Sequence, residues 1–182
     1  MRKVKYFFIV ISLLFLSGCH SLDPEQRDTF VSTYVTPHAS AAITLNIQAA
    51  PDLNAFDDLA NSCSLLVLQA TDKNVLTTLL KNKSQLALMF NRSPDLEVIL
   101  QSDKYVVMPG QKTTLHVDRA EGSKVVAVVA GYYPGPDIKN TIIENIPVNV
   151  SNTAWWGIDL LGESLPLKLD INMGKKSMTR IN

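Results

Sequence analysis

The sequence is poor in the residues that build catalytic and metal centres. It contains three histidines and two cysteines, and no pair of them has the spacing of metal ligands. His20 and His38 fall in a polar N-terminal segment, and His116 lies on the polar face of an expected strand. A Gly-x-Ser-x-Gly elbow, a Ser-x-x-Lys motif and a glycine-rich phosphate loop are also missing. We therefore expect a protein that is not an enzyme, with no catalytic residues, no metal and no cofactor.

A surplus of positive charge is missing as well. The chain has 17 lysines and arginines against 17 aspartates and glutamates. Arg2, Lys3 and Lys5 precede the first apolar run, which leaves 14 basic residues against 17 acidic ones in the rest of the chain. This balance gives no indication of nucleic-acid binding. No later apolar run reaches transmembrane length, so we expect the rest of the chain to be soluble.

The first apolar run ends close to a cysteine. Residues 6–16 are almost wholly apolar, about the length of the hydrophobic region of a secretory signal and short for a membrane span. The stretch Leu16-Ser17-Gly18-Cys19 resembles the lipobox of bacterial lipoproteins. The resemblance implies cleavage before Cys19, a lipid on its sulfur and an acylated new N-terminus. An ordinary signal peptide followed by a chance cysteine is the alternative.

This pattern divides the chain into three segments. Residues 1–18 are expected to be a lipoprotein signal peptide, residues 19–40 the lipidated Cys19 and a flexible, largely unstructured tether, and residues 41–182 a folded domain. In lipoproteins the residue after the cysteine acts as a sorting signal. Here it is His20 and not the aspartate that retains lipoproteins in the inner membrane, which implies the periplasmic face of the outer membrane. Cys63 is then the remaining cysteine, and we expect it to be a buried, unpaired thiol.

Several stretches alternate between apolar and polar residues, as half-buried strands do. Ile43, Leu45 and Ile47 share one face of the first stretch, whereas residues 125–130 are apolar throughout, which is typical of a central strand covered on both faces. Asp72 is placed to cap a short helix, and residues 84–103 fit either a helical turn or a strand. Further strands are expected at residues 64–70, 105–108, 113–117, 142–150 and 165–171, with residues 155–159 as another candidate. The expected apolar face of the helix holds Val75, Leu76, Leu79 and Leu80, and Leu165 is expected on the inner face of the last strand. Short strands separated by turns indicate an all-β, two-sheet sandwich.

The connection after the first strand, residues 49–62, is long for a link between strands. It carries three apolar residues that a surface loop normally avoids and three carboxylates: Leu53, Phe56, Leu59, Asp52, Asp57 and Asp58. Adjacent carboxylates on a loop are more often a solvated rim than acid–base machinery. The apolar residues either fold back to pad the sandwich or form an exposed patch that binds a partner, and the loop sequence alone leaves both possibilities open.

A series of short motifs resembles a known family. Behind the lipobox come Pro51-Asp52-Leu53-Asn54, Leu66-Val67-Leu68-Gln69, Leu79-Leu80, Tyr105-Val106-Val107-Met108-Pro109-Gly110 and Val126-Ala127-Val128-Val129-Ala130-Gly131-Tyr132. In this order they resemble the TssJ-like outer-membrane lipoproteins of type VI secretion systems, also called SciN, over roughly residues 10–150. The resemblance implies a transthyretin-like two-sheet β-sandwich with a short helical insertion.

The same resemblance implies a structural function. Members of the family anchor the secretion membrane complex by binding the periplasmic C-terminal region of TssM, an inner-membrane protein. In the family the loop between the first and second strands makes this contact, which corresponds here to about residues 50–62 and favours the exposed patch. The expected contact residues are Pro51, Asp52, Leu53, Asn54, Phe56, Asp57, Asp58 and Leu59.

The chain departs from the family after Gly131. Tyr132-Tyr133-Pro134-Gly135-Pro136-Asp137 stands where charged residues are common, so the role of this segment is open. The alternative function is a periplasmic lipoprotein that binds a glycan or another small molecule, with Tyr132, Tyr133, Trp155 and Trp156 lining a pocket. A deep pocket with convergent polar groups would favour that alternative, whereas a projecting apolar loop would favour the secretion lipoprotein.

Overall fold

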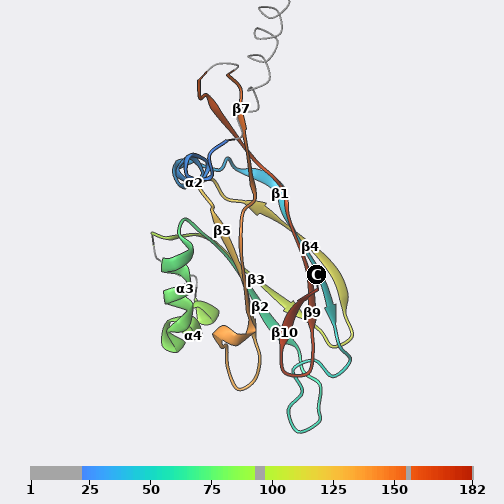
Figure 1. Ribbon diagram of the computed structural model, residues 1–182. Coiled ribbons are helices and arrows are strands. Elements are labelled where there is room, and N and C mark those ends of the chain that lie inside the picture. Colours follow the sequence, from blue (N-terminus) through green and yellow to red (C-terminus); the bar gives the residue numbers. More distant parts are fainter. Residues whose placement is uncertain (1–21, 93–96, 155–156, 182) are drawn as a thin grey trace, which may run out of the picture. The chain divides into compact units, whose positions relative to one another are not determined.

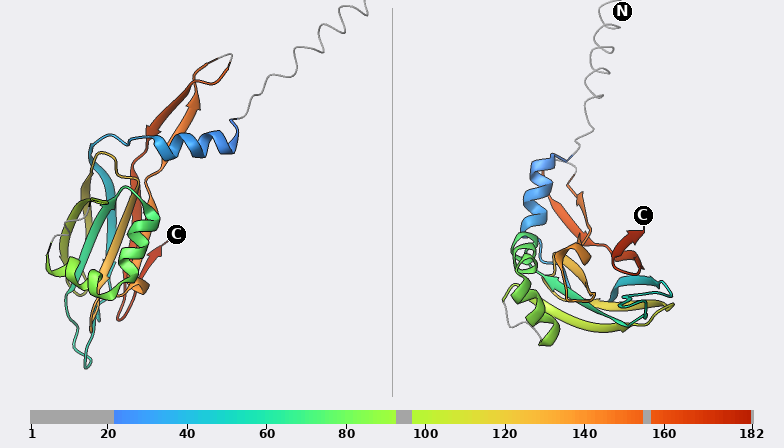
Figure 2. Two further views of the ribbon diagram at one scale, coloured as in Figure 1. Left: turned by 90° about the vertical axis from the view of Figure 1, so that its left-hand side faces the viewer. Right: turned by 90° about the horizontal axis from the view of Figure 1, so that it is seen from below.

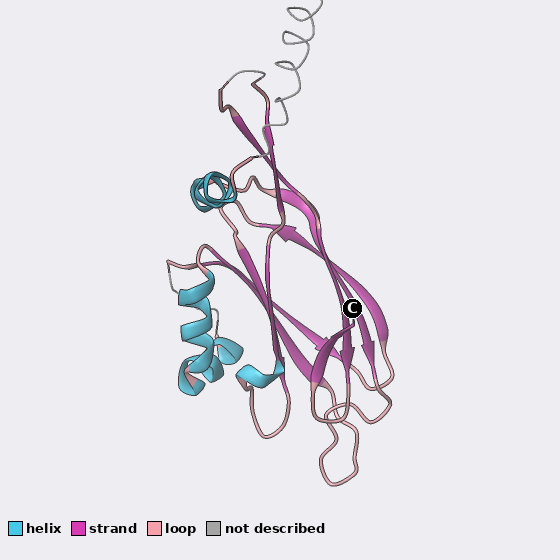
Figure 3. Ribbon diagram, viewed as in Figure 1, coloured by secondary structure: helices cyan, strands magenta, loops and turns pink. Residues whose placement is uncertain are grey.

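The computed structural model describes residues 22–92, 97–154 and 157–181, and its contacts separate into two compact units. The larger unit comprises Tyr34–Asn149 and Gly162–Asn182, and the smaller one comprises the chain up to Thr33 together with Val150–Leu161. The larger unit is a sandwich of two four-stranded sheets with helices beside one of them (Figure 1, Figure 3). The expected all-β sandwich with a short helical insertion is therefore confirmed.

The first sheet has the strand order β10-β9-β1-β4. Its strands are β1 (Ala39–Ala49), β4 (Lys112–Arg119), β9 (Leu167–Met173) and β10 (Met178–Ile181). β1 runs parallel to β9 and antiparallel to β4, and β10 runs antiparallel to β9. Ile43, Leu45 and Ile47 of β1 alternate with more exposed neighbours and lie in the core between the sheets. The period-two pattern of the sequence predicted this arrangement correctly.

The second sheet, with the order β3-β2-β5-β6, is covered on both faces at its centre. Its strands are β2 (Cys63–Ala70), β3 (Ile99–Val107), β5 (Val125–Gly131) and β6 (Thr141–Asn145). Along β2, Leu65 and Val67 belong to the core between the sheets, whereas Leu66 and Leu68 belong to a second apolar cluster shared with the helices. Because both faces are buried, the two central strands need apolar residues at almost every position, which explains the unbroken run at residues 125–130.

Helices α3 (Lys73–Lys81) and α4 (Lys83–Asn91) cover the outer face of the second sheet (Figure 2). Asp72 caps α3 as predicted, because its side chain accepts a hydrogen bond from the backbone N–H of Val75 at 2.8 Å. Leu76 and Leu80 are buried, but Val75 is exposed and does not belong to the packed face. Residues 84–103, which the sequence left undecided, contain most of α4, whose N-cap is Asn82, and the first part of β3.

In the smaller unit, α2 (Pro24–Thr33) is a polar helix with no buried residue. Asp23 begins it: the Asp23 Oδ1 accepts a bond from the N–H of Glu25 at 3.2 Å, and the Asp23 carbonyl accepts one from the N–H of Arg27 at 3.0 Å. An aspartate cap followed by a proline favours a helix start, so the expectation that residues 20–39 are largely unstructured is wrong for this stretch. The lipobox and Cys19 lie outside the described residues. No helix within the described ranges is long and apolar enough to cross a membrane.

The chain joins the sandwich before residue 41. Thr36 is buried, its Oγ1 donates to the carbonyl of Ser123 at 2.6 Å, and its carbonyl accepts a bond from the N–H of Gly122 at 2.8 Å. The buried Arg119 donates from Nε to the carbonyl of Pro37 at 3.0 Å. These bonds fix the backbone, so the tether expected to continue to residue 40 ends earlier, near Thr36.

Three expectations for the C-terminal third need correction. Residues 142–150 are not one strand, because Ile146 and Pro147 separate β6 from β7 (Val148–Asn152) and a proline has no N–H to pair. Residues 157–159 lie outside the strands, and Trp155 and Trp156 lie outside the described residues. Leu165 precedes β9 and is 39% exposed, so it does not share the inner face. β7 pairs with β8 (Leu160–Ser164), and the sequence pattern indicated neither β8 nor β10.

Candidate protein-binding loop

Four loops of the larger unit meet at one end of the sandwich (Figure 1). β4 and β10 run opposite to β1 and β9. The loops that follow β1 and β9 therefore lie at the same end of the sheet as the loops that precede β4 and β10. The N–H of Ala50 donates to the carbonyl of Met173 at 2.8 Å, and the N–H of Gly110 donates to the carbonyl of Ala50 at 3.0 Å. The loop at residues 50–62, which the family resemblance assigned to partner binding, therefore stands beside the loops at residues 108–111, 132–140 and 174–177.

Leu53 holds the base of this loop in the core. Its side chain is fully buried among the residues between the two sheets. Its N–H donates to the carbonyl of Ala50 at 3.1 Å, and its carbonyl accepts a bond from the N–H of Asn61 at 2.9 Å. The expectation that Leu53 contacts a partner directly is therefore wrong, because burial of an apolar side chain this close to the sandwich is more favourable than exposure. Leu53 packs in the core, as the alternative prediction from the sequence proposed.

Asn54 joins the two sides of the loop and ties them to a second loop. Its Nδ2 donates to the carbonyl of Ser62 at 2.8 Å, and its Oδ1 accepts a bond from the N–H of Tyr133 at 2.7 Å. Asn54 is nearly buried and has a φ of 47°, a left-handed conformation that asparagine tolerates better than most residues. This side chain is therefore a positioning residue of the loop and does not belong to its exposed surface.

The tip of the loop is a minimal β-hairpin. Phe56 and Leu59 exchange two backbone hydrogen bonds of 3.0 Å, one in each direction. The residues between them, Asp57 and Asp58, have φ values of 48° and 59°, as a type I′ hairpin turn requires. Phe56 is 45% exposed and Leu59 is 71% exposed, so this hairpin presents two large apolar side chains beside two carboxylates. The Asp58 carboxylate forms an exposed ion pair with the Lys175 ammonium at 3.0 Å.

The exposed part of the loop is thus smaller than the sequence suggested. The tip brings together Phe56, Asp57, Asp58 and Leu59, and Pro51 and Asp52 are exposed nearer the base. Tyr133 is 60% exposed and its ring packs against that of Phe56. The sequence placed Tyr133 in the alternative ligand pocket and in the segment that departs from the family pattern, and did not predict this contact with the loop.

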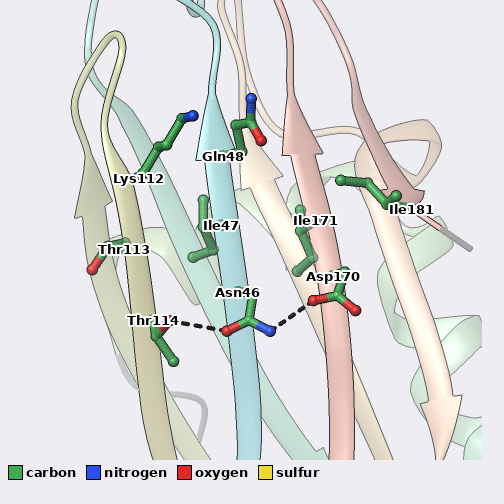
Figure 4. A pocket seen from close by; sticks show the side chains of 9 residues that line it. All are labelled: Asn46, Ile47, Gln48, Lys112, Thr113, Thr114, Asp170, Ile171 and Ile181. Atoms are coloured by element: carbon green, nitrogen blue, oxygen red, sulfur yellow. Dashed lines mark hydrogen bonds between the residues drawn. The ribbon is translucent and has the colours of Figure 1, made fainter.

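The open face of the first sheet carries a groove of about 390 Å³ (Figure 4). There Thr114 Oγ1 donates to Asn46 Oδ1 at 2.9 Å, and Asn46 Nδ2 donates to Asp170 Oδ1 at 2.6 Å. These bonds link the side chains of β4, β1 and β9 across the sheet. Three of the polar side chains of the groove are thus bonded to one another, and these bonds stabilise the sheet. Within the described ranges, no group of three or more His, Cys, Asp or Glu residues could hold a metal ion.

A second hollow of about 410 Å³ lies at the β5–β6 loop and is lined in part by Tyr132 and Tyr133. Tyr132 is buried, and its hydroxyl donates to the carbonyl of Ser177 at 2.9 Å. Burial raises the pKa of this hydroxyl far above its ordinary value of 10.0, and Cys63 contributes further in the same direction. Two of the four aromatic residues of the alternative ligand pocket therefore lie together, while the two tryptophans fall outside the described residues.

Comparison with known proteins gives a consistent result for the fold. The family described as "Type VI secretion lipoprotein, VasD, EvfM, TssJ" matches residues 41–154. Comparison with curated proteins finds no match.

Several solved structures have a similar fold, including the following three. Serratia marcescens Lip, described as a membrane bound component of the Type VI Secretion System, is 18% identical, with a TM-score of 0.52 over 77% of this chain and 96% of that one. The T6SS lipoprotein TssJ1 from Pseudomonas aeruginosa is 15% identical, with a TM-score of 0.52 over 80% and 96% of the two chains. A chain in the structure described as the T6SS protein TssM C-terminal domain from EAEC is 15% identical, with a TM-score of 0.50 over 77% and 97%.

Proposed function

The chain belongs to the type VI secretion lipoprotein family, and on that basis we propose that it is a non-enzymatic lipoprotein of the outer membrane that anchors the secretion membrane complex. Its partner is the periplasmic C-terminal region of a TssM-like inner-membrane protein. The observation that carries this proposal is the exposed hairpin at residues 56–59, which lies within the matched part of the chain.

The hairpin has the properties of a binding surface. Phe56 and Leu59 are large apolar side chains that water reaches, and apolar anchors of this kind dominate the affinity of protein interfaces. Their backbone is fixed by the turn and by the bonds of Asn54, so little conformational freedom remains to be lost on binding. The carboxylates of Asp57 and Asp58 give the apolar surface a polar rim.

The lipid on Cys19 is the other half of the proposed role. Residues 1–18 are removed as a signal peptide, and the acylated Cys19 holds the chain in the outer membrane on its periplasmic face. Each buried methylene contributes ~0.8 kcal/mol, and more than one acyl chain makes anchoring durable. Residues 19–35, which include α2, connect the anchor to the sandwich. A Cys19→Ser variant is then expected to fold and to bind the partner in solution but not to support secretion.

The loop is tested by a charge placed on its most exposed anchor. Leu59→Asp in the full-length mature protein is compared with Leu161→Asp, a matched change at a side chain that is 59% exposed on β8. We expect Leu59→Asp to weaken binding to the periplasmic region of the TssM-like protein by about 30-fold, the effect of losing a contact worth ~2 kcal/mol, and Leu161→Asp to leave it unchanged. Equal affinities of Leu59→Asp and the wild type would contradict the loop assignment, and no binding by the wild type would contradict the proposed partner.

A further inference from the structure

The hollow at the β5–β6 loop adjoins the hairpin tip and is lined by more lysines than carboxylates. It is lined by Lys83, Tyr132, Tyr133, Pro134, Gly135, Pro136, Asp137, Lys139, Asn140 and Lys176. Tyr133 belongs to this lining, and its ring lies against Phe56 of the hairpin tip. The pocket and the hairpin are therefore neighbouring parts of one surface.

Three lysines reach the pocket from three separate elements. Lys83 is the first residue of α4, Lys139 lies in the short helix η1 (Ile138–Asn140), and Lys176 lies in the turn between β9 and β10. The pocket also holds one carboxylate, Asp137, which is already engaged: its Oδ2 lies 3.8 Å from the Lys83 ammonium, and its Oδ1 accepts the N–H of Lys139. In the described part of the chain, the ammonium groups of Lys139 and Lys176 have no hydrogen-bonding or ion-pair partner. The pocket thus carries two positive charges that no carboxylate of the described residues pairs with.

We infer that this pocket receives an acidic side chain of the protein that binds the hairpin tip, an inference that rests on the proposed function. The cationic groups attract a carboxylate, and the tyrosines and prolines of the wall offer apolar surface to the chain that carries it. Continuity through Tyr133 with the tip favours a segment of the same partner over an independent small molecule.

The two sides of the Phe56–Tyr133 contact carry opposite charge. Asp57 stands on the hairpin side, and Lys139 and Lys176 stand on the pocket side. A partner that places its apolar surface over Phe56 and Leu59 can satisfy both charges in one orientation only. Charge complementarity of this kind sets the orientation and speeds association more than it adds to final affinity. Lys139 and Lys176, which line the pocket together with the segment at residues 132–137, therefore act in partner choice.

The test is a charge reversal with a matched control. Lys139→Glu/Lys176→Glu is compared with Lys112→Glu/Lys168→Glu, which changes the same charge at two exposed lysines of β4 and β9. The rate and equilibrium constants for the full-length mature variants and the periplasmic region of the TssM-like protein are measured at about 0.05 M and about 0.5 M salt, where screening is weak and strong. We expect the pocket variant to bind about tenfold more weakly at low salt, mainly through slower association, with the difference shrinking at high salt. The control variant changes affinity less than twofold.

Each outcome separates this inference from the proposed function. Equal affinities of the pocket variant and the control variant overturn the acidic contact, while loss of binding by Leu59→Asp in the same assay still supports the loop. Absence of binding by the wild type overturns both. Restored binding of Lys139→Glu/Lys176→Glu by a single Asp-to-Lys or Glu-to-Lys change in the partner would support the contact and identify the acidic residue.

Discussion

The ring of Phe56 packs against the ring of Tyr133, with centroids 4.3 Å apart and planes inclined at 48°. Phe56 stands on the loop that follows β1 in the first sheet, and Tyr133 stands just beyond β5 in the second sheet. The hydrogen bond from the backbone N–H of Tyr133 to the side-chain Oδ1 of Asn54 joins the same two loops. The hairpin tip is thus held from both sheets, which explains how a long connection can present apolar side chains in one fixed geometry.

The same substitution is expected to change the stability of the protein strongly at one leucine of the loop and very little at the other. Leu53→Asp places a carboxylate in the core between the sheets and should lower the free energy of unfolding by at least about 3 kcal/mol, because an unpaired charge is buried. Leu59→Asp changes a side chain that is 71% exposed and should alter stability by less than about 0.5 kcal/mol. Urea denaturation of both variants measures the difference. Similar unfolding free energies for the two would show that Leu53 is not held in the core.

The sequence predicted elements whose pattern is local and missed contacts that join distant segments. The alternation of Ile43, Leu45 and Ile47 and the continuous run in β5 were sufficient to predict their strands and their burial. The burial of Leu53 was not predictable in this way, because a loop has no periodicity that separates its inner from its outer side. The contact between the rings of Tyr133 and Phe56 was also not predictable, since the two rings meet only after both sheets have formed.

The sequence did not predict the short elements α2 and β10, and the physical reason differs between them. α2 has a clear start signal at Asp23 but no apolar face, so hydrophobic periodicity could not reveal it. β10 covers Met178–Ile181 and is too short to show an alternating pattern. In the candidate site, the apolar and acidic residues of the loop left an exposed patch and a padded core both open, and the family resemblance favoured the patch. The lysines of the adjoining pocket come from three separate elements that only the fold brings together.

The turn at the hairpin tip predicts which substitutions the loop tolerates. Asp57→Asn/Asp58→Gly supplies the residue pair most favoured in a type I′ turn and should keep the tip intact, losing only an exposed ion pair worth at most about 1 kcal/mol. Asp57→Val/Asp58→Val forces two β-branched residues to positive φ, at roughly 1–2 kcal/mol each, and should open the tip. Hydrogen exchange of the Phe56 and Leu59 amides distinguishes the two variants. Equal protection in both would contradict the turn assignment.

The buried side-chain amide of Gln69 links the two sheets, so its removal should cause a large loss of stability. The side chain of Gln69 in β2 is fully buried, donates from Nε2 to the carbonyl of Asp118 at 2.7 Å and accepts the N–H of Ala120 at 2.9 Å. Gln69→Leu leaves both backbone groups without a partner and should lower the unfolding free energy by about 2–4 kcal/mol. Gln48→Leu, at an exposed site on β1, is the control and should change it little. The urea midpoint at an unchanged denaturant slope gives both values.

The buried thiol of Cys63 predicts a loss of stability in alkaline solution. Cys63 is the free cysteine of the described residues, and burial raises the pKa of its thiol from 9.0 to about 12, although a hydrogen bond from the backbone of Gly131 acts in the opposite direction. Between these two values the unfolded chain releases the proton and the folded chain keeps it. The unfolded state binds fewer protons there, so the unfolding free energy falls as the pH rises, by up to about 1.4 kcal/mol per pH unit. Below pH 9 this part of the stability is fully present.

Cys63→Ala removes this titration and should give a shallower decline of the unfolding free energy above pH 9 than the wild type. Tyr132→Phe is measured beside it, because burial also raises the pKa of that hydroxyl and adds a decline of its own at higher pH. A thiol reagent provides an independent check, since the mature lipidated chain should react at Cys63 only when it unfolds. Rapid reaction of the folded protein, together with parallel slopes for the wild type and Cys63→Ala, would mean that solvent reaches the thiol in the folded state.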